Sequence, residues 1–199
     1  MKLVLATRNT DKIKEIKSIF KDTDHQLIPQ KRIVPKLIIT ETERTLAGNA
    51  RKKALLTMRA TKISTLAEDT GLEVYTLGGE PGVHSARYAG SGAKYEKNVK
   101  KLLKKMQSIP NKQRQARFRT VFALAIPGKP VRFFEGICSG KIAKEPKGKS
   151  GFGYDPIFIP KSYKHTFGQL STKTKNRISH RAKALMKVKR FLKKLKLSE

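Results

Sequence analysis

The sequence predicts an α/β fold that forms a single domain over residues 1–199. Short apolar runs alternate with segments whose apolar residues recur at helical spacing, as they do where strands and helices follow one another. With 199 residues and 38% hydrophobic content, the chain is long enough to bury one substantial core.

The first elements are a strand, a loop and a helix. The apolar run KLVLA over residues 2–6 predicts the strand, and isoleucines and a phenylalanine at helical spacing over residues 13–20 predict the helix. Asn9 or Thr10 can cap this helix, so that the backbone N–H groups of its first turn lie where the strand ends. Residues 45–60 predict a second amphipathic helix.

The middle of the chain predicts a strand, a loop and a third helix. We expect a strand at 62–69 that continues extended through 72–77 after Gly71. Residues 78–92 are too rich in glycine to form anything but a loop, and a helix follows at 94–107.

The last third of the chain predicts a hairpin and a basic helix. Strands at 116–126 and 131–143 are separated by PGKP, a hairpin sequence. The final helix, residues 179–197, has leucines and a valine on one face and lysines on the other. Such a helix could bind a membrane surface, but we favour docking on the core.

The net charge of +30 is unevenly spread along the chain. Residues 1–100 hold 19 basic and 11 acidic side chains, a balance of +8, whereas residues 101–199 hold 26 and 4, a balance of +22. Such a field attracts polyanions, including nucleotides, nucleic acid and anionic membranes. Because the lysines are interspersed with patterned apolar residues, we expect a solvated surface that binds nucleic acid only non-specifically.

The sequence also predicts a cytoplasmic location. No apolar run approaches the ~20 residues that span a bilayer, and the first residues lack the apolar core and cleavage site of a signal peptide. The single cysteine, Cys138, can form no disulfide within the chain and fits a reducing compartment. We expect no membrane partner.

Three segments carry residues suited to a nucleotide. Thr7 and Asn9 place polar side chains beside a helix N-terminus, with Lys12 one turn in, so that a phosphate could meet a hydroxyl, an amide, N–H groups and an ammonium. Phe152 lies between two glycines, which suits a ring on which a base stacks. The segment SHR at 179–181 supplies donors that match a purine 6-oxo group and not the 6-amino group of adenine.

Together these segments resemble, in order and over nearly the whole chain, the inosine triphosphate pyrophosphatase family, whose members hydrolyse non-standard purine nucleoside triphosphates such as ITP, dITP and XTP. LATRNTDKIKE resembles the family's T-x-N-x-x-K strand and helix, and TETERTLAGNARKKA its E-T-G-x-T-F-x-E-N-A-x-x-K-A motif. AEDTGLEVYTLGGEPGVHSARYAG, GFGYDPIF and KNRISHRAKAL complete the series. The resemblance implies a mixed, elongated, twisted sheet flanked by helices, in two lobes with a central cleft, and a homodimer.

The resemblance also implies a metal-dependent mechanism. Asp69 would be the catalytic residue and a Mg²⁺ ligand, with Glu41 also near the metal. Mg²⁺ suits such a site because it prefers one or two carboxylates plus substrate phosphates and retained waters. A water would attack the α-phosphorus, and pyrophosphate would leave.

The remaining site residues are assigned to the substrate by the same resemblance. Phe152 would stack on the base, and Asp155, Lys175, His180 and Arg181 would bind it by hydrogen bonds. The full set of substrate-binding residues is Thr7, Arg8, Asn9, Thr10, Asp11, Lys12, Lys53, Thr70, Phe152, Gly153, Tyr154, Asp155, Lys175, His180 and Arg181.

The chain departs from the family pattern at several positions, and two other functions remain open at this stage. Gly48 stands where the family usually carries a glutamate, Glu68 replaces an aspartate, and Arg8 replaces a glycine. One alternative is a Maf-like pyrophosphatase for pyrimidine nucleotides. The other is a catalytically weakened relative whose basic second half binds nucleic acid.

Overall fold

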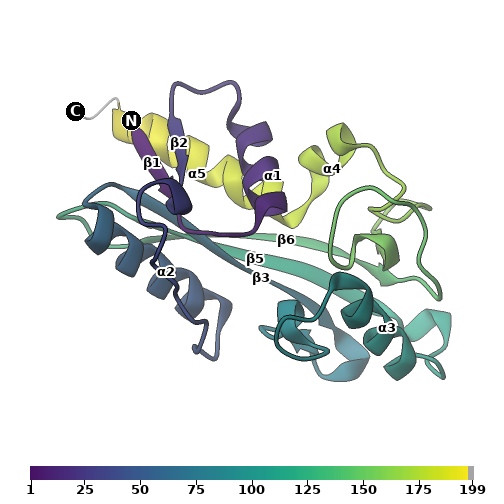
Figure 1. The fold of residues 1–199 in the computed structure, drawn as a ribbon. Helices are drawn as coiled ribbons and strands as arrows, with labels where there is room; N and C mark the ends of the chain where they lie inside the picture. Colours follow the sequence, from purple (N-terminus) through teal and green to yellow (C-terminus); the bar gives the residue numbers. More distant parts are fainter. Residues whose placement is uncertain (197–199) are drawn as a thin grey trace. The chain divides into compact units, whose positions relative to one another are not determined.

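A computed structural model of the protein describes residues 1–196 and confirms the α/β fold class (Figure 1). Helices and strands alternate along much of the chain, as the apolar pattern predicts. Their order is β1 (Lys2–Leu5), α1 (Thr10–Phe20), β2 (Gln26–Pro29), α2 (Leu46–Thr61), β3 (Thr65–Val74), β4 (Pro81–Gly82), α3 (Tyr95–Lys105), β5 (Gln115–Ala125), β6 (Arg132–Ile142), β7 (Phe158–Pro160), α4 (Thr172–Ile178) and α5 (His180–Lys196).

The strands form one mixed sheet in the order β2-β1-β3-β5-β6-β7, with β4 paired to β3. Strand β1 runs parallel to β2 and to β3, where Leu5 lies opposite Leu66. Strands β4 and β7 are antiparallel to β3 and β6 respectively. The sheet is flanked by helices, so the predicted mixed sheet is confirmed.

The chain forms two compact units, which we describe separately. Unit 1 comprises residues 1–69, residues 120–136 and the chain from Arg181 onward. Unit 2 comprises residues 70–119 and residues 137–180. Strands β3, β5 and β6 contribute residues to both.

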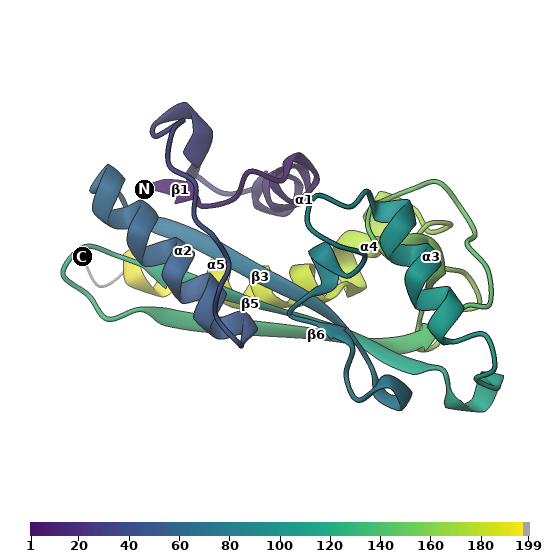
Figure 2. The same cartoon turned by 60° about the horizontal axis from the view of Figure 1, so that its bottom comes forward.

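In unit 1, helices cover both faces of the sheet (Figures 1 and 2). One face packs large apolar side chains, among them Leu66 of β3 and Leu124 of β5, against α1 and α5. The other face is built from alanines, including Ala67 of β3, and packs against Ala50 and Ala54 of α2. Because successive side chains of a strand point to opposite faces, this alternation also determines where the polar residues that follow must lie.

In unit 2, the core lies between the sheet and the segments around α3 and β7. Its buried side chains include Leu72, Phe118 and Phe158, and the rings of Phe118 and Phe158 are 4.7 Å apart. The neighbouring residues Glu73 of β3 and Arg117 of β5 point to the opposite face of the sheet, where they form an ion pair at 2.5 Å. Thus one face of this part of the sheet is apolar and the other is charged.

The structure departs from the sequence prediction in three places. The strand expected through residue 77 ends at Val74, because Tyr75–Leu77 forms a 3-10 turn that is closed by a hydrogen bond from Gly78 N to Tyr75 O. The expected loop at 78–92 contains the short strand β4. Strand β7 and helix α4 were not predicted; α4 is capped by Ser171 and lacks an apolar stripe.

Within residues 1–196, no helix combines the length and the apolar character that a membrane-spanning segment requires.

The pairing of β6 with β7 generates a prediction about unit 2. Gly140 lies opposite Pro160, and a Cβ atom at Gly140 would lie 2.2 Å from the carbonyl oxygen of Ile159. Gly140→Ala is therefore expected to lower the free energy of unfolding by about 1–3 kcal/mol, measured by urea denaturation. The neighbouring exposed change Ser139→Ala is the control, and equal stability of the two variants would contradict the prediction.

Candidate active site

Two adjacent carboxylates, Glu68 and Asp69, lie on β3 and face opposite sides of the sheet in unit 1. Glu68 is on the face of Leu66, toward α1 and α5, whereas Asp69 is on the face of Ala67, toward α2. Both are almost fully buried, at 1% and 4% exposure. A buried carboxylate is destabilising unless it is paired with hydrogen-bond donors or cations, and Glu68 and Asp69 have different partners of this kind.

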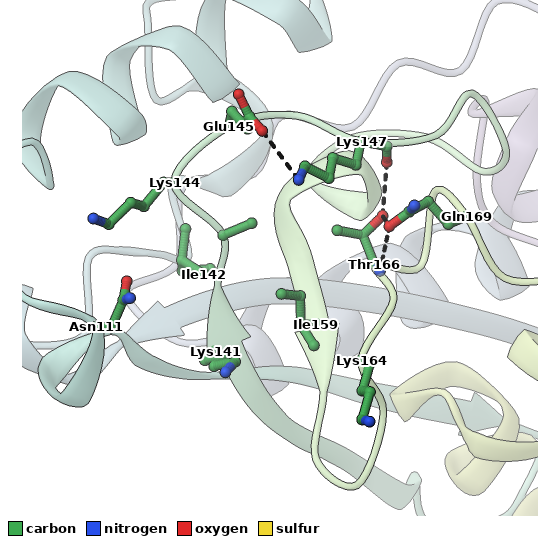
Figure 3. A pocket seen from close by; sticks show the side chains of 11 residues that line it. Asn111, Lys141, Ile142, Lys144, Glu145, Lys147, Ile159, Lys164, Thr166 and Gln169 are labelled. Atoms are coloured by element: carbon green, nitrogen blue, oxygen red, sulfur yellow. Dashed lines mark hydrogen bonds and ion pairs between the residues drawn. The ribbon is translucent and has the colours of Figure 1, made fainter.

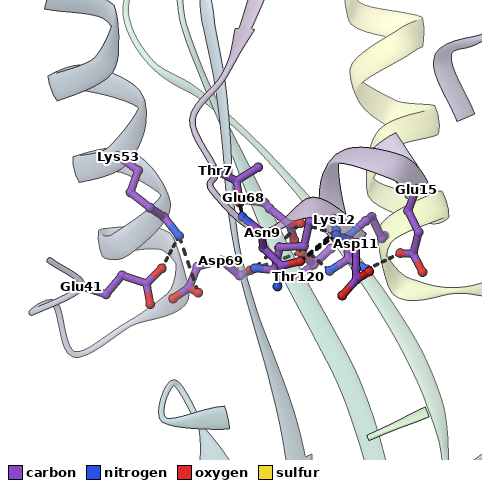
Figure 4. A network of polar contacts seen from close by, with 11 residues as sticks. Thr7, Asn9, Asp11, Lys12, Glu15, Glu41, Lys53, Glu68, Asp69 and Thr120 are labelled. Carbon is purple, nitrogen blue, oxygen red and sulfur yellow. Dashed lines mark hydrogen bonds and ion pairs between the residues drawn. The ribbon is translucent and has the colours of Figure 1, made fainter. Parts of the chain in front are cut away.

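Asp69 belongs to a group that we call the Asp69 cluster: Glu41, Asn49, Lys53 and Asp69. Figure 4 shows Glu41, Lys53 and Asp69 of this group. Asn49, which is fully buried, donates its Nδ2 to Asp69 Oδ2 at 2.9 Å. The Lys53 ammonium donates a hydrogen bond to Glu41 Oε1 and lies 3.9 Å from Asp69 Oδ1. Two carboxylates from different segments thus face the same cation.

Burial raises the pKa of the Asp69 carboxyl above its usual value, although the nearby Lys53 and Lys12 ammonium groups and the Asn49 amide act in the opposite direction. Glu41 adds to the increase through its negative charge. The charged form of Asp69 is therefore less favourable in the folded protein than in water. A further cation beside this carboxylate would stabilise it.

The Asp69 cluster fits a magnesium ion by the chemistry of its donors. Within residues 1–196 the structure contains no group of three or more His, Cys, Asp or Glu side chains placed to hold a metal. Mg²⁺ does not need such a group, since it is bound through one or two carboxylates together with substrate phosphates and water. Glu41 and Asp69 offer two carboxylates that already share one positive charge.

Glu68 belongs to a second group, the Glu68 network: Lys12, Glu15, Glu68, Thr120 and Arg181. The Arg181 guanidinium donates to both oxygens of Glu68, at 2.9 and 3.2 Å, and to Glu15 at 2.5 Å. Thr120 donates to Glu68 Oε2 at 3.0 Å, and the Lys12 ammonium is 3.9 Å from Oε1. Burial lowers the pKa of Arg181, but Glu68 and Glu15 raise it above its usual value overall.

The loop between β1 and α1 forms the capped helix N-terminus that the sequence predicts. Asn9 is the N-cap, and its side chain accepts hydrogen bonds from Asp11 N at 2.9 Å and Lys12 N at 3.2 Å. The Thr7 hydroxyl accepts from Asn9 N at 3.2 Å. Thr10 begins the helix, and Arg8 donates to the carbonyl oxygen of Pro35 at 3.1 Å, which turns its guanidinium toward the 33–40 segment.

Unit 2 brings together most of the residues assigned to the base, in a group that we call the Phe152 platform: Tyr95, Phe152, Asp155 and Lys175. The rings of Tyr95 and Phe152 are 5.8 Å apart, and the Lys175 ammonium lies 5.0 Å from the centre of the Phe152 ring. Lys175 is bonded to the buried Asp155, which also accepts from Phe152 N at 2.8 Å.

The glycines beside Phe152 have a clear structural reason. Gly151 and Gly153 both have positive φ, at 77° and 64°. A Cβ atom at Gly151 would lie 2.1 Å from Asp155 Oδ2, so only glycine permits the close approach of the loop to this carboxylate. The Phe152 ring borders a hollow of about 900 Å³ whose other wall is α3.

Other predicted substrate residues lie nearby in sequence but have different surroundings. Burial raises the pKa of Tyr154, whose hydroxyl donates to Ser85 O at 2.9 Å. The buried His180 ring stacks on Phe118 at 4.5 Å, and Thr70 is half-buried on β3. Arg181 belongs to the Glu68 network of unit 1, so its assignment to the base stays a prediction.

A second hollow in unit 2 contains none of the predicted site residues (Figure 3). Its volume is about 330 Å³, and it is lined by Lys141, Lys144, Lys147 and Lys164 among other residues. Lys147 pairs with Glu145 at 3.0 Å. These exposed lysines fit the solvated basic surface that the composition predicts.

Sequence reasoning did not single out Asn49, Glu15 or Thr120. Asn49 lies in the segment GNA and Glu15 in the segment KIKE, both within motifs that carry the resemblance. A signal for Asn49 was present, because an amide in an otherwise apolar helix face must be hydrogen-bonded when it is buried. Thr120 had no such signal, since threonine is common on strands.

Comparisons with known proteins extend over nearly the whole chain. Residues 3–191 match the family model described as the Ham1 family. A "dITP/XTP pyrophosphatase" of Desulforamulus reducens is 44% identical over 195 residues, which cover 98% of this chain and 97% of the relative. The protein of the same name from Bacillus subtilis is 42% identical over 189 residues, 95% of this chain and 96% of the relative.

Solved structures give the same result. The Ham1 protein of Staphylococcus aureus superimposes with a TM-score of 0.87 at 38% identity, over 97% of this chain and 98% of that one. A "Nucleoside-triphosphatase / dITP/XTP pyrophosphatase" from Mycobacterium abscessus has a TM-score of 0.77 at 34% identity, over 94% and 98% of the two chains.

The raised pKa of Asp69 predicts how its substitution affects stability. In metal-free protein at pH 7, Asp69→Asn should raise the Tm, because the wild type keeps a buried negative charge that the amide lacks. As the pH falls toward the raised pKa, the wild-type carboxyl becomes neutral and the difference in Tm should shrink. Thermal unfolding in EDTA between pH 7 and pH 4 measures this.

The exposed change Asp22→Asn serves as the control for the loss of one acidic side chain. A lower Tm for Asp69→Asn at pH 7, or a difference in Tm that does not vary with pH, would contradict the prediction. Either result would show that the pKa of the Asp69 carboxyl is not raised by burial.

Proposed function

The chain belongs to the Ham1 family, and from this premise we propose that it hydrolyses non-standard purine nucleoside triphosphates, among them dITP, ITP and XTP, to the monophosphate and pyrophosphate. Relatives that match almost its full length are named dITP/XTP pyrophosphatases. The family resemblance inferred from the motifs is thereby confirmed. The Maf-like and nucleic-acid-binding alternatives gain no support from these relatives.

The Asp69 cluster is the observation that carries the proposed chemistry. Glu41 and Asp69 face one ammonium, and Asp69 is buried with a raised pKa. A carboxylate whose pKa lies above its usual value is a better proton acceptor at neutral pH than an exposed aspartate. Asp69 is thus suited to take the proton of the water that attacks the α-phosphorus as the bond to the leaving pyrophosphate breaks.

We propose Mg²⁺ as the cofactor, held by Asp69 and Glu41. When bound, it supplies charge neutralisation of the triphosphate, which would otherwise be repelled by the two carboxylates. Lys12 and Lys53 bring further positive charge, and the N-terminus of α1, with its cap Asn9, offers N–H groups of the kind that bind phosphate. Thr7 and Thr70 complete the residues assigned to the phosphates, and Arg8, Thr10 and Asp11 of the same loop belong to the proposed substrate-binding set.

The Phe152 platform is proposed to bind the base. Base stacking on an aromatic ring stabilises binding by on the order of 1–3 kcal/mol and does not discriminate between bases. Discrimination is assigned to Lys175, whose ammonium carries three N–H donors and no acceptor. A 6-oxo group accepts from such a donor, whereas the 6-amino group of adenine does not. Asp155 holds Lys175 over the Phe152 ring, and Gly153, Tyr154, His180 and Arg181 complete the set.

Four further features are proposed on the resemblance and the composition. The protein is a homodimer, it works in the cytoplasm, it forms one functional domain over residues 1–199, and its basic surface binds nucleic acid only non-specifically. Light scattering of the purified protein tests the dimer.

A turnover panel tests the proposed function. Wild-type protein with Mg²⁺ at alkaline pH should release pyrophosphate from dITP, ITP and XTP much faster than from dATP, dTTP or UTP. Asp69→Asn should reduce the turnover of dITP by roughly 10²–10⁴-fold, since the proton acceptor is lost. Circular dichroism should show that the variant retains its fold.

Absence of pyrophosphate release from dITP would defeat the proposed activity. Preference for dTTP or UTP would favour the Maf-like alternative, and unchanged turnover of Asp69→Asn would remove Asp69 from the mechanism.

A further inference from the structure

The hollow of about 330 Å³ in unit 2 has a basic lining that the proposed function does not use. Four lysines and one glutamate line it, a balance of +3. Glu145 pairs with Lys147 at 3.0 Å. In the part of the chain that the structure describes, no acidic side chain pairs with the other three, which are Lys141, Lys144 and Lys164. Three ammonium groups around one hollow repel one another, and an anion between them would offset that repulsion.

Hydrogen bonds hold the two walls of the hollow, residues 141–147 and 159–169, in place. The hydroxyl of the buried Thr166 donates to Lys147 O at 2.6 Å, which joins one wall to the other. Lys147 N donates to Pro156 O at 2.8 Å. At their other end the walls are joined by the antiparallel pairing of β6 with β7. The hollow is therefore formed by fixed backbone, so a ligand does not have to order its walls.

The lining also indicates the class of anion. Its described residues include two amides, Asn111 and Gln169, and no aromatic ring on which a base could stack. Gln169 Oε1 accepts from Thr166 N at 3.1 Å, which leaves the Nε2 of the same amide to donate to a ligand. The volume lies at the lower end of the range of about 300–1,000 Å³ that is usual for ligand pockets. The hollow thus suits a small group rich in phosphate oxygens and not a nucleoside.

We propose that this hollow binds a short inorganic phosphate chain, such as tripolyphosphate or pyrophosphate. A lysine ammonium binds phosphate as a point charge with three donors. A chain in the hollow would lie between Lys144 on one wall and Lys164 on the other (Figure 3). The hollow contains none of the residues assigned to the proposed function, so this inference goes beyond that function and does not depend on it.

Methyl NMR of the whole protein, without divalent cations, locates the binding. Ile142 and Ile159 line the hollow, so their δ1 methyl groups report on it, whereas Ile13 of α1 reports separately on unit 1. Tripolyphosphate at about 0.15 M ionic strength should shift the signals of Ile142 and Ile159 saturably. Pyrophosphate should need a higher concentration, and orthophosphate at least about tenfold more than tripolyphosphate, because each carries less charge. Absence of a saturable shift at the two methyl groups would overturn the inference.

Two matched double variants test whether the lysines form the site. Lys144→Gln/Lys164→Gln should weaken the Kd for tripolyphosphate at the hollow by about tenfold, because it removes one ammonium group from each wall. Lys187→Gln/Lys193→Gln, which removes the same charge from exposed positions of α5, should leave that Kd unchanged. Equal weakening by both variants would reduce the binding to overall charge and overturn the inference.

A short oligothymidylate separates a phosphate chain from the backbone of a nucleic acid. At equal phosphate concentration it should shift the methyl signals of Ile142 and Ile159 less than tripolyphosphate does, because the lining offers its bases no ring for stacking. Equal or larger shifts with the oligothymidylate would assign the hollow to nucleic acid and overturn the inference.

Discussion

The alternation of side chains along β3 is the constraint on which the site in unit 1 depends. Glu68 and Asp69 are adjacent in sequence, so the strand sends their carboxylates to opposite faces of the sheet. In a chain with a net charge of +30, each face can provide its own cations. Neither carboxylate could be buried without them, because an uncompensated buried charge is strongly destabilising.

The two carboxylates have partners of different kinds. Glu68 accepts hydrogen bonds from Nε and Nη2 of Arg181 and from the Thr120 hydroxyl, so a guanidinium lies directly against its charge. The Asp69 carboxylate accepts from the neutral amide of Asn49, and the Lys53 ammonium, which is bonded to Glu41, lies 3.9 Å from it. Burial raises the pKa of Asp69, and Lys53, Lys12 and Asn49 offset this increase only in part. Glu68 is thus suited to link β3 to β5 and α5, and Asp69 is suited to bind a further cation.

Much of the fold was predictable because it follows from local patterns. Asn9 and Thr45 cap α1 and α2, as small polar residues at the start of an amphipathic helix commonly do. The PGKP hairpin lies between β5 and β6. Helix α4 was missed because its burial depends on a charged residue: Lys175 is 5% exposed and is held by Asp155 and two aromatic rings. Hydrophobic periodicity gives no signal for such a helix. The sequence shows which residue types are present at the site, but not which partners they contact. His180 and Arg181 are adjacent in SHR, yet His180 stacks on Phe118 and Arg181 donates to Glu68.

We propose that the Asp69 carboxylate, whose pKa is raised by burial, binds a divalent cation where the Lys53 ammonium now lies between it and Glu41. A crystal structure with Mn²⁺ and a slowly hydrolysed analogue of dITP tests it most directly through the anomalous signal of the metal. The account predicts a manganese peak within ~2.5 Å of an Asp69 carboxylate oxygen, the bonding range of hard divalent cations, with the Lys53 ammonium displaced from Glu41. A manganese ion bound elsewhere, with Lys53 still bonded to Glu41, would contradict it.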